Sequence, residues 1–427
     1  MRLWVRRAAR LRAAVLPVVA AIACSAAVAS RQPRAAEAAR APHSYASRTV
    51  RIALAQHQPV VHVSSAGSWR IYSADGGTEA ALTEPGERWI LEREGSRVSA
   101  RREDSHPVSH RDSPLIIRSN DRDGTILFNG RRWRGELLVS STDAGLLVVN
   151  RVGIDDYVKG VVPLEIGTGA PADLAAVEAQ AVAARSYAVT HLAGGSRSFD
   201  MVATVGDQVY GGATAENTVG NQAVDATAGL VLRYDGRVVN APYHANCGGS
   251  TAEPEDVWRT SAEPYLQRVS DQIPGTTRFY CDQAPRFRWT RTFGERDLRD
   301  AVDRYVAKLS NGGNVGRVRD VRVAAVTPAG RVATLAIETD RRTLSLRGNE
   351  MREALRSPSG ELLYSTYFSV DAVQGAGVVE QLTLRGGGNG HGVGMCQSGA
   401  IGRARAGQDF QTILRTYYPG TTVGALD

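Results

Sequence analysis

The hydrophobic pattern over the first third of the chain is typical of short strands joined by tight turns. From Thr49 onward, stretches in which apolar and polar residues alternate are separated by Gly-Gly, Pro-Gly and Asp-Gly pairs. Such pairs favour turns because glycine adopts the positive φ angles that tight turns need. The predicted strands are Val50–Leu54, Pro59–Val63, Ser68–Tyr72, Trp89–Leu91, Leu115–Arg118, Gly130–Ser140 and Leu146–Val152.

The rest of the chain mixes helical and extended patterns. An Ala-rich run over Pro171–Leu192, followed by Gly194 and Gly195, predicts a long helix. Further helices are expected over residues 215–228, 295–309, 349–357 and 410–416, and strands over 230–234, 237–241, 318–327 and 331–339. Groups of strands with separate helices indicate an α+β fold rather than a doubly wound sheet. We expect a strand-rich region over residues 48–144 and a mixed region over 145–427.

One carboxylate stands out beside the Ala-rich helix. The stretch from Asp156 to Leu164 is interpreted as an apolar strand that runs into Pro163 and then presents Glu165. Its apolar neighbours are Val161, Val162, Leu164 and Ile166. An apolar setting raises the pKa of a carboxyl group, which suits a residue that donates and accepts protons. An ordinary solvated glutamate at a strand end explains the same residues, so chemistry alone leaves both interpretations open.

The N-terminus carries the pattern of a secretory signal peptide. Five arginines precede an apolar run, Ala13–Ala23, and small residues typical of a cleavage site follow at Ala27–Ala29. We therefore expect residues 1–30 to direct export to the cell envelope. Residues 31–47, rich in Ala, Arg, Ser and Pro, are expected to form a disordered linker. An uncleaved membrane anchor and lipidation at Cys24 are the alternatives.

The charge balance is moderately basic. The 427 residues carry a net charge of +7, and the positive charge comes almost entirely from arginine. A balance of this size suits a polyanionic bacterial wall at least as well as a nucleic acid. The body of the chain has no dense basic run with interleaved aromatic residues, so no nucleic-acid partner is expected.

Three cysteines follow the predicted leader: Cys247, Cys281 and Cys396. Export permits disulfides, and a Cys247–Cys281 bridge would close a loop that has several prolines and little periodicity. The odd number leaves one thiol unpaired or paired between chains. His244 and the three cysteines also have the residue types of a zinc site, although nothing in their spacing favours that arrangement.

A series of ordered motifs extends from about residue 145 to the C-terminus. The motifs are Tyr157–Glu165, Glu178–Tyr187, Asp207–Tyr210, Tyr243–Thr251, Pro264–Leu266, Leu344–Arg352 and Gly390–Ala400. Together they resemble the signature of the SpoIID/LytB family, whereas residues 49–144 match it only in their strand-rich character.

The resemblance implies an exported lytic transglycosylase that acts on peptidoglycan glycan strands in wall remodelling such as sporulation. Such an enzyme cleaves the β-1,4 bond between N-acetylmuramic acid and N-acetylglucosamine without water and leaves a 1,6-anhydro end. Other members of the family are called amidase enhancers. The alternative is therefore a non-catalytic, wall-binding module that stimulates an N-acetylmuramoyl-L-alanine amidase.

The resemblance also assigns roles to residues. It makes Glu165 the single catalytic carboxylate, acting first as acid and then as base. It implies that the substrate is bound by Gln180, Arg185, Tyr243, His391 and Gln397. Gln180 can equally brace the segment that bears Glu165. No cofactor is expected, and no metal, because residues 198–207 lack the two His and two Cys with which some members bind zinc.

Overall fold

The computed structural model describes residues 48–74, 76–104, 109–167, 169–258, 260–309 and 312–426. The expected signal peptide, the expected linker and Cys24 lie outside these residues and stay predictions. Among the described helices, none combines the length and apolarity that crossing a membrane requires.

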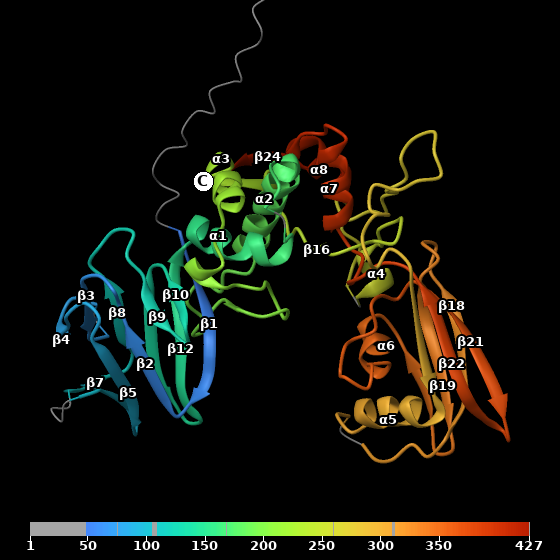
Figure 1. Ribbon diagram of the computed structural model, residues 1–427, viewed down its shortest axis with the longest axis horizontal. Coiled ribbons are helices and arrows are strands. Elements are labelled where there is room, and N and C mark those ends of the chain that lie inside the picture. Colours follow the sequence, from blue (N-terminus) through green and yellow to red (C-terminus); the bar gives the residue numbers. More distant parts are fainter. Residues whose placement is uncertain are drawn as a thin grey trace, which may run out of the picture. The chain divides into compact units, whose positions relative to one another are not determined.

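Two sheets that share one core make up residues 49–153 (Figure 1). The larger sheet has the strand order β13-β1-β12-β11-β8-β3-β4, and the smaller has the order β10-β9-β2-β5-β6-β7. The strands are β1 (Thr49–Gln58), β2 (Val60–Ser64), β3 (Trp69–Tyr72), β4 (Glu79–Leu82), β5 (Arg88–Glu94), β6 (Arg97–Arg102), β7 (Ser109–Asp112), β8 (Leu115–Ser119), β9 (Ile126–Phe128), β10 (Arg131–Trp133), β11 (Glu136–Thr142), β12 (Gly145–Gly153) and β13 (Met201–Val202).

The alternating pattern along these strands separates a buried face from an outer face. In β11, Leu137 and Val139 lie in the core that both sheets share, whereas Leu138 packs on the opposite side with a small separate cluster. The strands predicted in this region are present, except that Gly130–Ser140 is not one strand: it divides at Gly135, which has a positive φ, into β10 and β11 of different sheets. Strands β4, β6, β7 and β9 were not predicted. Strand β12 begins at residue 145, where the mixed region was expected to start. It nevertheless pairs antiparallel with β1 and β11, which belong to the strand-rich region.

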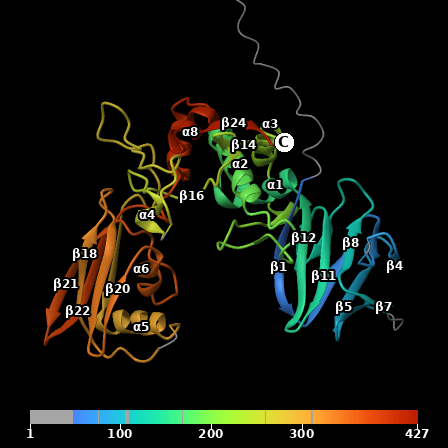
Figure 2. The same ribbon diagram turned by 180° about the vertical axis from the view of Figure 1, so that it is seen from behind.

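A group of helices surrounds the buried helix α2 (Leu174–Thr190). Eleven of its 17 residues are buried, and six of these are alanines, which let neighbouring elements approach closely. Figure 2 shows α1, α3 and α8 around it. The neighbours are α1 (Ile154–Glu165), η2 (Pro171–Asp173), α3 (Thr218–Ala226), α7 (Gln397–Arg405), α8 (Phe410–Tyr417) and β14 (Leu230–Tyr234). Strand β14 pairs with β15 (Arg237–Val238) and β24 (Thr422–Ala425), and β16 (Tyr243–His244) pairs in parallel with β23 (Met395–Cys396).

The segment before Glu165 is a helix, so its interpretation as a strand was wrong. Helix α1 buries Ile154, Tyr157, Val158, Val161 and Val162, which follow the i, i+3, i+4, i+7, i+8 spacing of one helix face. The valines suggested a strand, but this spacing and the contact with α2 decide the conformation. Two aspartates in the first turn suit the positive end of the helix dipole.

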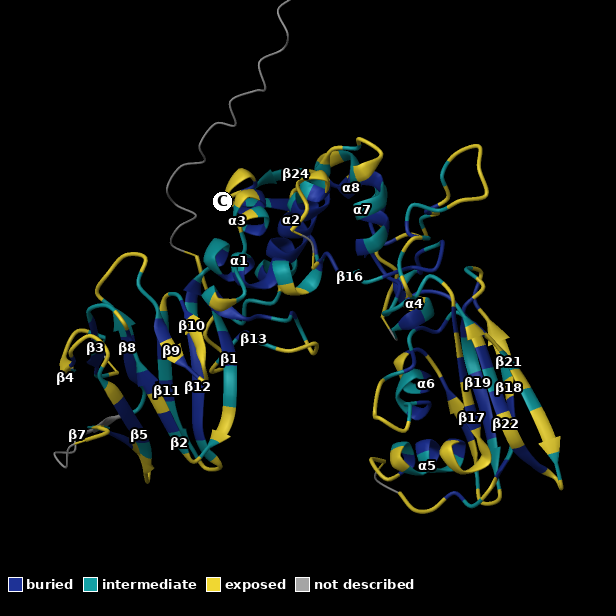
Figure 3. Cartoon of the chain, in the orientation of Figure 1, coloured by how far each residue is buried: buried dark blue, intermediate teal, exposed yellow. Residues whose placement is uncertain are grey.

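A second core holds together residues 289–386. It lies among the sheets β17-β22-β21 and β18-β19-β20 and two helices, and Figure 3 shows that α5 has a buried and an exposed face. The elements are β17 (Trp289–Gly294), α5 (Glu295–Val306), β18 (Val318–Val326), β19 (Val332–Thr339), β20 (Thr343–Leu346), α6 (Asn349–Ala354), β21 (Phe368–Gly375) and β22 (Val378–Gly386). A short helix, α4 (Pro254–Val257), and η3 (Gly212–Thr214) complete the described elements.

The α+β class is confirmed. The helices expected after residue 171 are present; four have shorter bounds, and α8 ends one residue later than expected, at Tyr417. Asp235-Gly236 forms the predicted hairpin turn with positive φ at both residues. The patterns did not predict β20, β21 or β22, nor helix α7, which begins within the motif Gly390–Ala400.

Candidate active site

A cleft of about 600 Å³ lies at Glu165, and its walls come from segments that are far apart in the sequence. Pockets of this size commonly bind small ligands or short pieces of a polymer. Helix α1 contributes Glu165, α2 contributes Tyr187, the residue after α2 is His191, and the loop after β13 contributes residues 205–209. The other lining residues are Asn240, Pro242, Tyr243, His244, Ala245, Trp258, Asn349, Gly390, His391 and Gln397.

Glu165 is held at the last turn of α1, partly buried in the cleft wall. The backbone N–H of Val209 donates to Glu165 Oε1 at 2.7 Å. Burial raises the pKa of Glu165, and this hydrogen bond and one from Gln397 oppose the rise only in part. The negative end of the helix dipole acts in the same direction as burial. Gly167, with φ +68°, ends the helix just beyond the carboxylate.

The apolar neighbours of Glu165 in the sequence do not line the cleft. Val161, Val162 and Ile166 are buried in the core, and Leu164 is exposed. The cleft wall at Glu165 includes residues 205–209 and Gln397 of α7, which tertiary packing brings to the end of α1. The hydrogen bonds from Val209 and Gln397 lower the pKa of Glu165 and so oppose the effect of burial.

Gln397 lies between Glu165 and Gln180. It hydrogen-bonds the carboxylate, and its Nε2 also donates to Gln180 Oε1 at 3.2 Å. Gln180 is fully buried and is not among the lining residues. The geometry therefore favours the bracing role for Gln180, whereas Gln397 faces the cleft as expected.

Tyr243 and His391 both line the cleft, as the resemblance implied. Both ring nitrogens of His391 are engaged: Nδ1 accepts from the Val393 N–H at 3.1 Å, and Nε2 lies 2.8 Å from the Tyr243 carbonyl oxygen. Burial lowers the pKa of His391 to about 4, so the ring is neutral near pH 7. His391 thus shapes the wall and is not free to transfer a proton. The Tyr243 hydroxyl accepts from Gln208 Nε2 at 2.8 Å.

Arg185 does not reach the cleft, so its assignment to substrate binding has no geometric support. Its side chain is fully buried, and its Nε donates to Asp155 Oδ1 at 2.7 Å. Its Nη1 donates to the Leu230 carbonyl oxygen at 2.9 Å. Arg185 therefore ties α2 to the start of α1 and to β14.

Asp207 and Trp258 are among the cleft residues that were not identified from the sequence. Asp207 is a second carboxylate in the cleft, with one oxygen accepting from the Tyr187 hydroxyl at 3.3 Å and the other from the Val202 N–H at 2.8 Å. Trp258 packs against His391, with ring centroids 5.0 Å apart. Asp207 opens one of the motifs quoted above, so its position in that motif could have indicated it. No motif or pattern in the sequence indicated that Trp258 would line the cleft.

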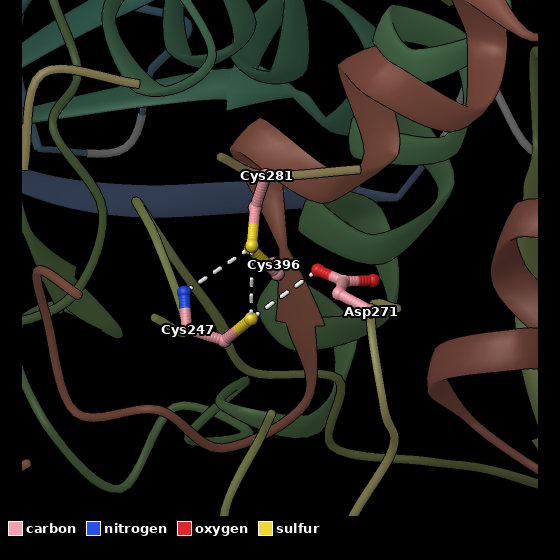
Figure 4. Close-up of side chains that lie close together, drawn as sticks. All are labelled: Cys247, Asp271, Cys281 and Cys396. Atoms are coloured by element: carbon pink, nitrogen blue, oxygen red, sulfur yellow. Dashed lines mark hydrogen bonds between the residues drawn. The ribbon is translucent and has the colours of Figure 1, made fainter. Parts of the chain in front are cut away.

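The predicted Cys247–Cys281 disulfide is not formed. The two sulfur atoms lie 3.5 Å apart, both residues are free thiols, and so is Cys396. A disulfide bond would place the sulfurs about 2.05 Å apart. Figure 4 shows why no pair is singled out: Cys396 and Asp271 point into the same buried space.

Comparison with known proteins identifies two matched regions. The family model for stage II sporulation protein (SpoIID) matches residues 142–234, and a domain of unknown function (DUF8618) matches residues 275–394. The first region contains α1, α2 and Glu165, and the second covers most of the second core.

Three similar proteins were found, and the names of two of them agree with the first match. An uncharacterized protein of Brachyspira hyodysenteriae is 32% identical over 71% of this chain and 74% of its own length. The amidase enhancer of Bacillus subtilis is 30% identical over 62% of this chain but only 40% of its own length. Stage II sporulation protein D of Bacillus subtilis is 28% identical over 65% of this chain and 76% of its own length. On its motifs, the SpoIID match around Glu165 and these relatives, the chain belongs to the SpoIID/LytB family.

Proposed function

We propose that this protein is an exported peptidoglycan lytic transglycosylase in which Glu165 is the single acid and base. The observation that carries the proposal is the setting of Glu165: a carboxyl group with a raised pKa in the wall of a cleft of about 600 Å³. A carboxyl group that is protonated near working pH can donate to a leaving oxygen.

The reaction has two proton transfers through one carboxyl group. Protonated Glu165 donates to the glycosidic oxygen as the bond from that oxygen to C1 of N-acetylmuramic acid breaks. The resulting carboxylate then accepts the proton of the sugar's own C6 hydroxyl as O6 attacks C1. The product is a 1,6-anhydro ring, Glu165 is protonated again, and no water is consumed.

The other lining residues suit a sugar polymer. Tyr187, Tyr243 and Trp258 offer aromatic surfaces and polar groups, the combination that binds the apolar faces and hydroxyls of sugar rings. Gln397, held by Gln180, hydrogen-bonds Glu165 and keeps the carboxyl group oriented toward the cleft. The basic N-terminal segment followed by an apolar run supports export to the cell envelope, where the substrate lies.

The test uses purified protein and glycan strands stripped of stem peptides, with products identified by mass spectrometry. Wild type is expected to release 1,6-anhydro products, and Glu165→Gln should lower the rate at least about 1000-fold, because it removes the only group that transfers protons. Asp207→Asn is the matched control at the second cleft carboxylate. Products with ordinary reducing ends, lost in both variants, would instead mean a hydrolase with two carboxylates.

A non-catalytic amidase enhancer is the second candidate, because one relative carries that name. In that case the cleft binds a glycan strand and the chain stimulates a separate N-acetylmuramoyl-L-alanine amidase. Glu165→Gln separates the two candidates. An enhancer keeps its stimulation of a purified amidase in this variant, and its wild type releases no 1,6-anhydro product.

A further inference from the structure

We propose that Cys247, Cys281, Cys396 and Asp271 form a structural zinc site. This inference goes beyond the proposed function and does not depend on it. The four ligand atoms all lie within 4.8 Å of one another, and all four residues are buried (Figure 4). Three thiolates and one carboxylate oxygen are the ligand types that Zn²⁺ binds in tetrahedral structural sites. His244, which the sequence suggested as a fourth zinc ligand beside the three cysteines, is not in this group. Asp271 is the fourth ligand instead.

The spacing of the cluster is near that of a zinc site. Zinc–sulfur bonds of about 2.3 Å at tetrahedral angles hold two sulfurs about 3.7 Å apart. The Cys247 and Cys281 sulfurs lie 3.5 Å apart, and the Cys247 sulfur lies 3.2 Å from Asp271 Oδ2. A disulfide would use only two of the three cysteines and leave a thiol and a carboxylate buried beside it.

Backbone N–H groups surround the sulfurs. The N–H of Cys247 points at the Cys396 sulfur at 3.2 Å, and the N–H of Gly399 points at the same sulfur at 3.3 Å. The N–H of Gly249 lies 3.4 Å from the Cys247 sulfur. Such donors stabilise thiolate rather than thiol, and partners of this kind orient the ligands of metal sites.

Asp271 is arranged to offer one oxygen to a metal. Its Oδ1 accepts from the Tyr417 hydroxyl at 2.6 Å and from Arg403 Nη2 at 3.1 Å, which leaves Oδ2 directed at Cys247. The carboxylate is fully buried. Second partners that hold the non-ligating oxygen in this way are a regular feature of zinc sites.

Buried positive charge adjoins the cluster. The guanidinium groups of Arg403 and Arg331 are both buried, and Arg403 pairs with Asp271. Arg331 donates from Nη2 to the Cys247 carbonyl oxygen at 2.9 Å. Its Nη1 has no hydrogen-bond partner among the described residues, although the partly buried Asp256 attracts its charge. Cations this close favour thiolates over thiols, and thiolates are the form that binds zinc.

The zinc site would stabilise the structure of the candidate active site. Cys396 is the residue before Gln397, which hydrogen-bonds Glu165, and Cys247 follows the strand that carries Tyr243. Cys281 and Asp271 lie in the long segment between α4 and β17, which has few regular elements. A metal therefore joins this segment to both walls of the cleft.

The experiment measures zinc directly. The full-length chain is produced with added Zn²⁺, purified without chelator and analysed by mass spectrometry for metal content. We expect about one zinc per chain, and we expect a thiol reagent to modify the three cysteines only after a strong chelator removes the metal. Chelation should also lower the melting temperature by about 10 °C or more, and added Zn²⁺ should restore it.

Variants assign the site. Cys281→Ser and Asp271→Asn should each lower zinc affinity at least about tenfold. Asp200→Asn is the control, because Asp200 is also a buried carboxylate paired with an arginine, 2.7 Å from Arg51, and it lies beside β1 of the larger sheet rather than in the cysteine cluster. Three results would each overturn the proposal: wild type with less than about a tenth of a zinc per chain, a Cys247–Cys281 disulfide in the zinc-supplemented protein, or full zinc content in Cys281→Ser. The first two use wild type, so they hold even if a variant fails to fold.

Discussion

Glu165 illustrates how a single residue is tuned by its surroundings. Burial disfavours the charged form of Glu165, and the hydrogen bonds from the Val209 N–H and from Gln397 offset this effect only in part. Because its folded-state pKa is raised, its ionisation costs stability as the pH rises through that pKa. Glu165→Gln removes this cost, so the variant should be inactive yet no less stable than wild type at neutral pH.

Gln397→Met should shift the pH dependence of Glu165. Gln397 donates to the carboxylate and thereby lowers its pKa, so its removal raises the pKa further. The acid form then persists to higher pH, and the alkaline limb of kcat/KM should move in that direction. The same shift should be visible when the Glu165 carboxyl carbon is titrated by NMR, a readout that needs no activity. Gln267→Met is the control, since Gln267 is exposed and donates only to the Pro264 carbonyl oxygen.

At the scale of the element, the first turn of α1 fixes the position of the helix, and its last turn carries the proposed catalytic residue. Asp155 in the first turn binds the fully buried Arg185 of α2, and Glu165 ends the helix in the cleft. Five apolar residues on one face add the burial that holds α1 in the core. The residue expected to bind substrate, Arg185, thus serves the site by fixing the helix that carries Glu165.

Asp155→Asn should lower the free energy of unfolding by about 2–3 kcal/mol. The substitution keeps the shape of the side chain but leaves the Arg185 charge buried without a counter-ion. The Asp155 side chain is 30% exposed, which places the expected loss below that for a fully enclosed pair.

Asp225→Asn breaks the other ion pair of α1, 2.8 Å from Lys159, and serves as the matched control. Because Asp225 is 65% exposed, the loss there should stay under about 1 kcal/mol. Urea unfolding of both variants makes the comparison, and equal losses would show that burial of Arg185 is not what gives the Asp155 pair its strength.

At the scale of the whole molecule, the described residues form two large hydrophobic cores. The larger contains residues from Val50 to Leu426, because β23, α7, α8 and β24 return to pack with α2 and β14. The second core uses only residues between Trp289 and Leu384. Its first and last strands are neighbours, with Trp289 opposite Gly386 in the register of β17 and β22. It is therefore an insertion whose ends lie side by side.

Residues 287–388 should fold when produced alone. They contain every residue of the second core and both ends of its sheet. We expect dispersed amide signals by NMR and cooperative thermal unfolding by circular dichroism. Residues 145–286 are the contrasting fragment and should not fold, because β23, α7, α8 and β24 are missing from their core. An unfolded 287–388 fragment would mean that the second core depends on the rest of the chain.

Features that depend on neighbouring residues and on ordered motifs could be predicted from the sequence. Alternation predicted most of the strands of residues 49–153, the Ala-rich run predicted α2, and the motifs led to Glu165 and to the family. These features could be read because strand alternation and helix periodicity are local properties.

The tertiary structure set the features that depend on contacts between distant segments. It made the segment before Glu165 a helix and turned Arg185 inward to Asp155. It also placed Asp271 among three cysteines that lie in separate segments. No local pattern encodes these outcomes, because burial and charge pairing are set by whichever residues the fold brings together.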